Sequence, residues 1–86
     1  MQSINSKFIL YGTEGCHLCD EARDLVDLVL ATMTDQLDYP TIDIADDAHL
    51  VEQYGTSIPV LKAIQLEHAL YWPFDAKQIN EFIRKL

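Results

Sequence analysis

The sequence predicts a single α/β domain spanning residues 1–86, in which short strands alternate with helices. Apolar residues recur every three or four positions in three segments, as they do along helices with one buried face. Between these segments lie apolar runs of strand length, which gives the order β-α-β-α-β-β-α. The length of 86 residues allows one modest hydrophobic core and is too short for two domains.

The first predicted strand covers residues 8–11, and its lack of polar alternation is typical of a central strand covered on both faces. A helix is predicted from about His17 to Met33. Its buried face should consist of Leu18, Ala22, Leu25, Val26, Val29 and Met33.

A second strand should lie within residues 37–44, where Pro40 favours an edge position or a late start because it lacks an N–H. Asp46 or Asp47 is expected to cap a short helix, and Gly55 suits the position just after its end. The inward residues of this helix should be Leu50, Val51 and Tyr54. The alternation of strands and helices predicts a right-handed crossover between parallel strands.

Two more strands are expected at residues 58–64 and 67–72. The link between them is too short for a crossover helix, so they should form an antiparallel hairpin. The sequence Asp75-x-x-Gln78 has the form of a capping box and predicts the start of a last helix. The buried stripe of that helix should consist of Ile79, Phe82, Ile83 and Leu86.

Cys16 and Cys19 lie at the predicted turn between the first strand and the first helix. The first N–H groups of a helix lack partners within the helix, and this end carries a partial positive charge. A thiolate of Cys16 would be stabilised there and could act as a nucleophile. Cys19 could then attack a mixed disulfide at Cys16, as two-step thiol–disulfide exchange requires.

Two other interpretations of the cysteine pair stay open at this point. The pair could be half of a zinc site, although structural zinc needs four ligands, and His17, His49 and His68 show no second-pair spacing. The thiols could also be inert and buried, because free cysteine packs as a small apolar residue. We expect no metal, and no cofactor other than the redox-active disulfide.

The acidic residues are concentrated in one part of the chain. The net charge is −8, and residues 14–52 hold eleven of the fourteen acidic residues but only one of the six basic ones, Arg23. Nucleic acid and anionic membrane surfaces would be repelled by such a protein. The acidic stretch either docks a partner with a basic face or is simply the solvated face of the first helix.

No run approaches the ~18 apolar residues of a membrane span, and residues 1–7 lack the pattern of a signal peptide. We therefore expect a cytoplasmic protein that does not bind membranes. In a reducing compartment, paired cysteines are more often catalytic than structural.

Two motifs resemble the small glutaredoxin form of the thioredoxin fold, and the resemblance covers about residues 8–86. The first runs from Tyr11 to Cys19 and contains Cys16-His17-Leu18-Cys19. The second, Tyr54-Gly55-Thr56-Ser57-Ile58-Pro59-Val60-Leu61, is similar to the cis-proline loop that faces the cysteines in that superfamily. The resemblance implies a four-stranded mixed sheet flanked by helices.

The resemblance to glutaredoxins also implies a substrate-binding loop made of Ser57, Ile58 and Pro59, with a cis Ile58–Pro59 bond. The exposed backbone of Ile58 would pair with an extended substrate in the manner of strand addition. An ordinary trans proline that opens a strand is the alternative.

The chain departs from the glutaredoxin pattern around its cysteines. His17 and Leu18 stand where the family typically has proline and tyrosine, and Thr13 and Glu14 offer no lysine before the motif. We regard His17 and Glu14 as candidate modulators of the Cys16 thiolate, although His17 can also be a spacer with no role. Acidic neighbours oppose the helix end, so the pair should be reducing.

A further departure concerns glutathione. Of the family's Gly-Gly-x-Asp segment, which holds the glutathione carboxylate, only Asp75 remains, behind the bulky Trp72-Pro73-Phe74. Such side chains would block close backbone approach to a ligand, so glutathione is a disfavoured substrate. Trp72 and Phe74 either form a docking patch or cover the end of the core.

The sequence and the resemblance together predict a glutaredoxin-like thiol–disulfide oxidoreductase. Cys16 is the expected nucleophile and Cys19 the resolving thiol. The expected partners are a protein or small-molecule disulfide as substrate and a thiol as reductant, and we expect a monomer. The alternative is a non-catalytic binding module of the same fold that docks a protein through its acidic face and the Trp72 region.

Overall fold

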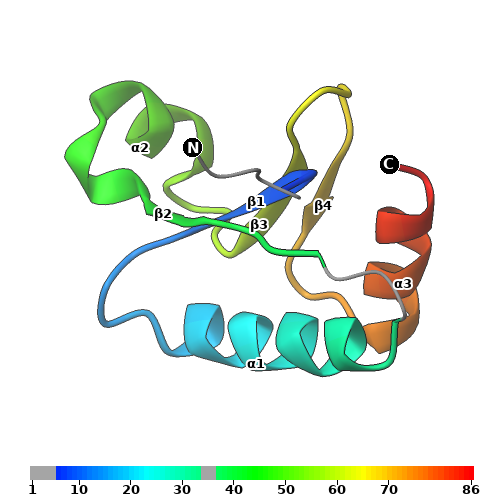
Figure 1. The fold of residues 1–86 in the computed structure, drawn as a ribbon. Helices are drawn as coiled ribbons and strands as arrows, with labels where there is room; N and C mark the ends of the chain where they lie inside the picture. Colours follow the sequence, from blue (N-terminus) through cyan, green and yellow to red (C-terminus); the bar gives the residue numbers. More distant parts are fainter. Residues whose placement is uncertain (1–5, 34–36) are drawn as a thin grey trace, which may run out of the picture.

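The structure is a computed structural model that describes residues 6–33 and 37–86. Residues 1–5, used in the test for a signal peptide, and Asp35, counted in the acidic stretch, lie outside the described residues. Within the described ranges the elements follow the order β1-α1-β2-η1-α2-β3-β4-α3, with helices on both faces of a sheet (Figure 1).

The described strands form one mixed sheet with the order β2-β1-β3-β4. The central β1 (Phe8–Gly12) pairs in parallel with β2 (Thr41–Asp43) and antiparallel with β3 (Val60–Ala63). β3 forms an antiparallel hairpin with β4 (Ala69–Tyr71). The central first strand, the parallel pair and the hairpin confirm the sequence predictions. β2 is an edge strand that starts directly after Pro40.

Helix α1 (His17–Ala31) packs its Ala22, Val26 and Val29 side chains into the core and ends two residues before the predicted Met33. The prediction that Leu18 lies on this buried face was wrong, because its side chain is 44% exposed. In the first turn the inward position belongs to Cys19, which is buried against β1. Among the described helices, none is long and apolar enough to cross a membrane.

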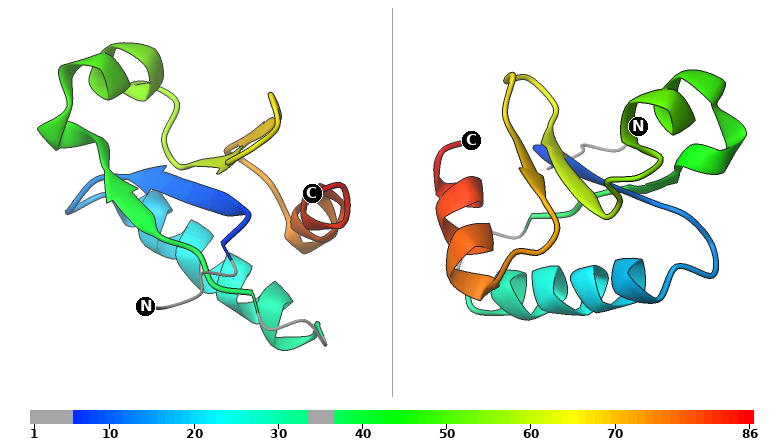
Figure 2. Two further views of the ribbon diagram at one scale, coloured as in Figure 1. Left: turned by 45° about the horizontal axis from the view of Figure 1, so that its top comes forward. Right: turned by 180° about the vertical axis from the view of Figure 1, so that it is seen from behind.

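Helix α3 (Ala76–Arg84) begins with the predicted capping box. The Asp75 carboxylate accepts a hydrogen bond from the Gln78 N–H at 2.8 Å, and the Asp75 N–H donates to Gln78 Oε1 at 3.0 Å. Helices α1 and α3 cover the same face of the sheet, where they enclose the larger core with β1 and β3 (Figure 2). That core consists of Phe8, Leu10, Ala22, Val26, Val29, Leu61, Ala63, Phe74, Ile79, Phe82 and Ile83.

Phe74 and Trp72 lie at one end of this core. Phe74 is 5% exposed, and the half-buried Trp72 ring meets it edge to face, with the ring centroids 5.0 Å apart. The two residues therefore cover the core, which is one of the two interpretations that the sequence allowed, rather than forming a surface patch.

On the opposite face of the sheet, helix α2 (Ala48–Tyr54) covers a second, smaller cluster of Ile44, Tyr54 and Val60 (Figures 1 and 2). Asp47 caps this helix by accepting from the N–H groups of its first turn. Val51 is 44% exposed, so its predicted inward position was wrong. The helix has only two turns, and their inner side is filled by Tyr54 and the half-buried Leu50.

Gly55 directly follows the last residue of this helix, which confirms the position predicted for it. Its φ of −54° belongs to the right-handed helical region, so the helix does not end on a left-handed residue. Its lack of a side chain matters for space instead, because a Cβ there would lie 2.5 Å from the carbonyl oxygen of Val51.

Candidate active site

The two cysteines form a disulfide at the start of α1, with their Cα atoms 5.2 Å apart. Cys16 is the N-cap of the helix, and its sulfur accepts a hydrogen bond from the Cys19 N–H at 3.2 Å. Cys16 is half-buried, whereas Cys19 is only 5% exposed. The structure therefore gives Cys16 both the helix-end hydrogen bond and the better access for an incoming molecule.

The pairing of β1 with β3 brings the Pro59 loop to the end of β1 from which the chain leads to the cysteines. Tyr11 pairs with Val60, so the preceding Pro59 lies next to the end of β1. At that end, Gly12 lies close to Cys19, since a Cβ on Gly12 would lie 3.0 Å from the sulfur of Cys19.

The Ile58–Pro59 peptide bond is cis. A second cis bond, Trp72–Pro73, has no counterpart in the sequence predictions. Pro59 is fully buried, and Ser57 and Ile58 are half-buried. The Ile58 N–H already donates to the Tyr54 carbonyl at 3.1 Å. A substrate strand that pairs with Ile58 would therefore have to use its carbonyl or displace this bond.

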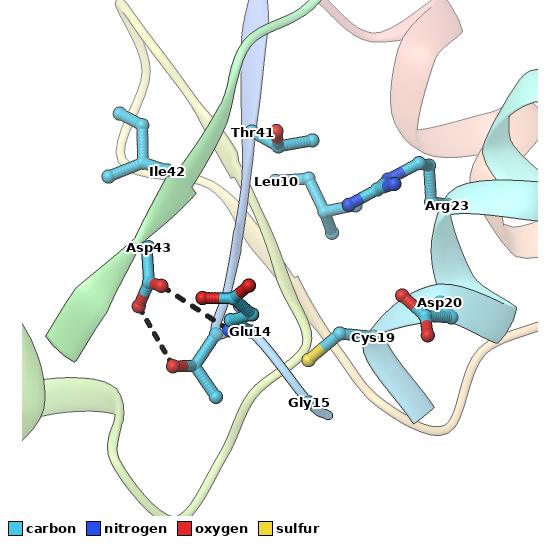
Figure 3. A pocket seen from close by; sticks show the side chains of 11 residues that line it. Leu10, Glu14, Gly15, Cys19, Asp20, Arg23, Thr41, Ile42 and Asp43 are labelled. Carbon is cyan, nitrogen blue, oxygen red and sulfur yellow. Dashed lines mark hydrogen bonds between the residues drawn. The ribbon is translucent and has the colours of Figure 1, made fainter. Parts of the chain in front are cut away.

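The loop between β1 and α1 is tied to the end of β2 by Asp43. Its carboxylate accepts hydrogen bonds from the Thr13 hydroxyl at 2.8 Å and the Glu14 N–H at 3.3 Å (Figure 3). It also accepts from the Ala45 N–H at 2.9 Å. These hydrogen bonds favour the charged form and hold the pKa of Asp43 below its ordinary value of 3.8. The bond from the Ala45 N–H has the largest effect, and the bond from the Thr13 hydroxyl the next largest. The same loop holds Cys16, because the Cys16 N–H donates to the Thr13 carbonyl at 3.3 Å.

A hollow of about 430 Å³ opens beside the buried cysteine, between α1 and the ends of β1 and β2. Figure 3 shows the Cys19 sulfur pointing into it, with Arg23 and Asp20 reaching in from α1 and Glu14 from the loop. The charged residues of the hollow's lining are the acidic Glu14, Asp20 and Asp43 and the basic Arg23.

The two candidate modulators occupy different positions. Glu14 lines the hollow and contributes its N–H to Asp43. The His17 side chain is 91% exposed, with its Nε2 3.9 Å from a carboxylate oxygen of Glu21 one turn further along α1. The structure therefore places Glu14 beside the cysteine site and His17 at the solvent surface.

Of the described residues, no three His, Cys, Asp or Glu side chains are grouped so that they could hold a metal ion. Asp75, the single match to the family's glutathione-binding segment, is engaged in the capping box of α3.

Sequence reasoning missed three residues of this site: Gly12, Asp43 and Arg23. A signal for Asp43 was present, because side chains that follow parallel strands meet at one edge of a sheet. The register pairs Asp43 with Gly12, directly before the loop that leads to the cysteines. Gly12 and Arg23 depend on how α1 packs against β1, for which the sequence holds no comparable signal.

The fold and this site define a thioredoxin-fold protein with a paired-cysteine motif at the start of its first helix. The sequence model of one family, described as "Glutaredoxin-like domain (DUF836)", matches residues 7–84. The chain therefore belongs to the family of glutaredoxin-like domains. A comparison with curated proteins gave no match.

Solved structures agree with this assignment. The X-ray structure of protein XcR50 from X. campestris is 32% identical, with a TM-score of 0.77, over 92% of this chain and 97% of that one. Protein Ne2328 from Nitrosomonas europaea is 28% identical, with a TM-score of 0.73, over 95% of each chain. Thioredoxin 1 from Thermosipho africanus is 13% identical, with a TM-score of 0.65, over 92% of this chain and 91% of that one. This last likeness concerns the fold alone.

Proposed function

We propose that this protein is a thiol–disulfide oxidoreductase that reduces a disulfide substrate with the Cys16–Cys19 pair. The observation that carries the proposal is the placement of the pair, with Cys16 at the helix N-cap and Cys19 buried one turn later. The N–H group that reaches the Cys16 sulfur, together with the partial positive charge of the helix end, favours a thiolate there by about 0.3–1 kcal/mol at an exposed site.

In the first step, the Cys16 thiolate attacks one sulfur of the substrate disulfide. A new S–S bond joins Cys16 to that half of the substrate, the original S–S bond breaks, and the other half leaves as a thiolate that takes a proton from water. The half-buried position of Cys16 supports its role as the attacking group, because the buried Cys19 is harder to reach.

In the second step, Cys19 loses its proton and attacks the sulfur of Cys16. The Cys16–Cys19 disulfide forms, and the bound half of the substrate leaves as a thiolate, so two electrons have passed to the substrate. The Cα separation of 5.2 Å lies within the range that a disulfide requires. A thiol reductant then restores the dithiol by the reverse exchange.

The surroundings of the pair support a reducing character and a substrate other than glutathione. Glu14 and Asp20 line the hollow beside Cys19 and oppose a thiolate. A weakly stabilised reduced form corresponds to a potential nearer about −270 mV than about −120 mV. We propose a protein or small-molecule disulfide as substrate and a cytoplasmic setting, where thiol reductants would keep the pair reduced.

Turnover of a peptide disulfide tests this function. The reduced protein should accelerate the cleavage of a fluorescence-quenched peptide disulfide with dithiothreitol as reductant, and Cys16→Ser should abolish the acceleration. His49→Ala, an exposed substitution on α2, should leave it unchanged. A wild-type pair that stays reduced in mild oxidant and does not accelerate cleavage would contradict the proposal and favour the binding module. Replacing dithiothreitol by glutathione shows whether glutathione can serve as the reductant.

A further inference from the structure

Asp43 stands at the centre of a hydrogen-bonded bridge that leads from β2 to the nucleophile. One carboxylate oxygen, Oδ1, accepts from the Thr13 hydroxyl at 2.8 Å and from the Ala45 N–H at 2.9 Å. The other oxygen, Oδ2, accepts from the Glu14 N–H at 3.3 Å. Figure 3 shows the bonds that run from Asp43 to the loop before α1. One side chain therefore connects two segments about thirty residues apart in sequence.

The loop that Asp43 holds is the one that orients Cys16. The Thr13 carbonyl accepts the Cys16 N–H at 3.3 Å, and Cys16 then begins α1 with an extended backbone at φ −84° and ψ 111°. This N-cap conformation allows the Cys16 sulfur to accept the Cys19 N–H. A displacement of Thr13 would therefore alter the geometry on which the helix-end stabilisation of the sulfur depends.

We propose that Asp43 is a positioning residue for Cys16, because its carboxylate fixes the Thr13–Glu14 loop and, through it, the backbone of the nucleophile. The inference rests on the proposed function, in which Cys16 attacks the substrate. Asp43 also carries a negative charge, which by itself disfavours a nearby thiolate. Positioning and charge therefore have opposite effects on the reactivity of Cys16, so an experiment can separate them.

Two substitutions at Asp43 remove the same charge but different contacts. Asp43→Asn can keep an oxygen at the Oδ1 position, whereas its NH₂ group would face the Glu14 N–H, donor against donor. Asp43→Ala removes all three hydrogen bonds. The readout is the rate at which iodoacetamide modifies Cys16 in the reduced protein, measured across pH, with Asp46→Ala as a matched removal of an exposed charge from the same turn.

If Asp43 positions Cys16, Asp43→Ala should lower the rate near neutral pH by roughly three- to tenfold, as when the thiolate fraction falls by that factor. Asp43→Asn should fall between Asp43→Ala and wild type, and Asp46→Ala should match wild type. Equal rates in wild type and Asp43→Ala, or faster modification in both Asp43 variants, would overturn the inference. Faster modification would show that charge is the dominant effect.

A pair of substitutions at Thr13 tests the same bridge without any change of charge. Thr13→Val removes the hydroxyl that donates to Asp43, and Thr13→Ser keeps it. The inference requires slower modification of Cys16 in Thr13→Val and recovery in Thr13→Ser. These two variants decide the question if circular dichroism shows that Asp43→Ala does not fold, and equal rates in the two would refute the inference.

The failure of this inference can be told apart from the failure of the proposed function. Modification of Cys16 by iodoacetamide needs no turnover, and wild-type turnover is measured separately with the peptide disulfide. If the wild type turns over the peptide disulfide but the Asp43 and Thr13 variants are modified at Cys16 as fast as wild type, the positioning role alone is refuted. Inactive wild type would refute the oxidoreductase, whatever the variants do.

Discussion

Gly12 and Cys19 are in contact across the space between β1 and α1, where a Cβ on Gly12 would lie 3.0 Å from the Cys19 sulfur and 3.1 Å from its Cβ. Gly12 is also the last residue of β1, so this contact sets how closely the start of α1 approaches the sheet. A side chain larger than hydrogen has no room at this position unless Cys19 moves.

Gly12→Ala should therefore destabilise the oxidised protein by about 1–3 kcal/mol, the usual cost of overpacking a tight contact. The effect should be smaller in the reduced protein, where the Cys19 side chain is free to rotate away. Urea unfolding of both redox forms measures the two changes. Equal destabilisation of the two forms would show that the clash is with the Cβ of Cys19, which does not move when the side chain rotates, rather than with the sulfur.

The unequal exposure of the two sulfurs predicts unequal reactivity. In the reduced protein, iodoacetamide should modify Cys16 at least about tenfold faster than Cys19, because only Cys16 combines the helix-end position with access to solvent. Mass spectrometry of peptides from a time course gives both rates. Faster modification of Cys19 would reverse the roles assigned to the two cysteines.

The lowered pKa of Asp43 predicts a sensitivity to acid. Hydrogen bonds in the folded state favour its charged form, so its contribution to stability is fully present above the unfolded-state pKa near 3.8. As the pH falls below that value, towards the lower folded-state pKa, the contribution is lost. Urea midpoints measured down to about pH 2.5 should therefore fall less steeply in Asp43→Asn than in wild type. Parallel curves would show that Asp43 has no net linkage to folding.

The capping box of α3 predicts a separate effect on stability. Asp75→Ala removes the acceptor for the Gln78 N–H and should destabilise the protein by about 0.5–2 kcal/mol. Lys77→Ala, an exposed neighbour on the same helix, should change stability by less than about 0.5 kcal/mol. The comparison uses urea unfolding, and equal effects of the two substitutions would argue against the cap.

Much of the fold could be predicted because its signals are local. Strand-length apolar runs, the capping box at Asp75 and the short link between β3 and β4 determine elements and their pairing without knowledge of the whole chain. The errors at Leu18 and Val51 have a similar cause. Leu18 lies in the first turn of α1 and Val51 on the two-turn α2, where the apolar pattern continues but the neighbouring elements leave the residue 44% exposed.

The candidate site was only partly predictable for a similar reason. The position of Cys16 at a helix start follows from the spacing of apolar residues around it, and the structure confirms it. The contact of Gly12 with Cys19 and the bridge from Asp43 to Thr13 arise from tertiary packing. The bonded N–H of Ile58 depends likewise on the turn after α2, which periodicity does not describe.

The central claim is that Cys16 attacks a disulfide and Cys19 resolves the product. Reaction of the reduced protein with an aromatic disulfide that releases a coloured thiol tests it most directly. Wild type should release two equivalents of thiol and end as the Cys16–Cys19 disulfide, whereas Cys19→Ser should release one and keep a stable adduct on Cys16. Cys16→Ser should react slowly, because Cys19 is buried. A stable adduct that forms rapidly on Cys19 in Cys16→Ser, with none on Cys16 in Cys19→Ser, would contradict the account.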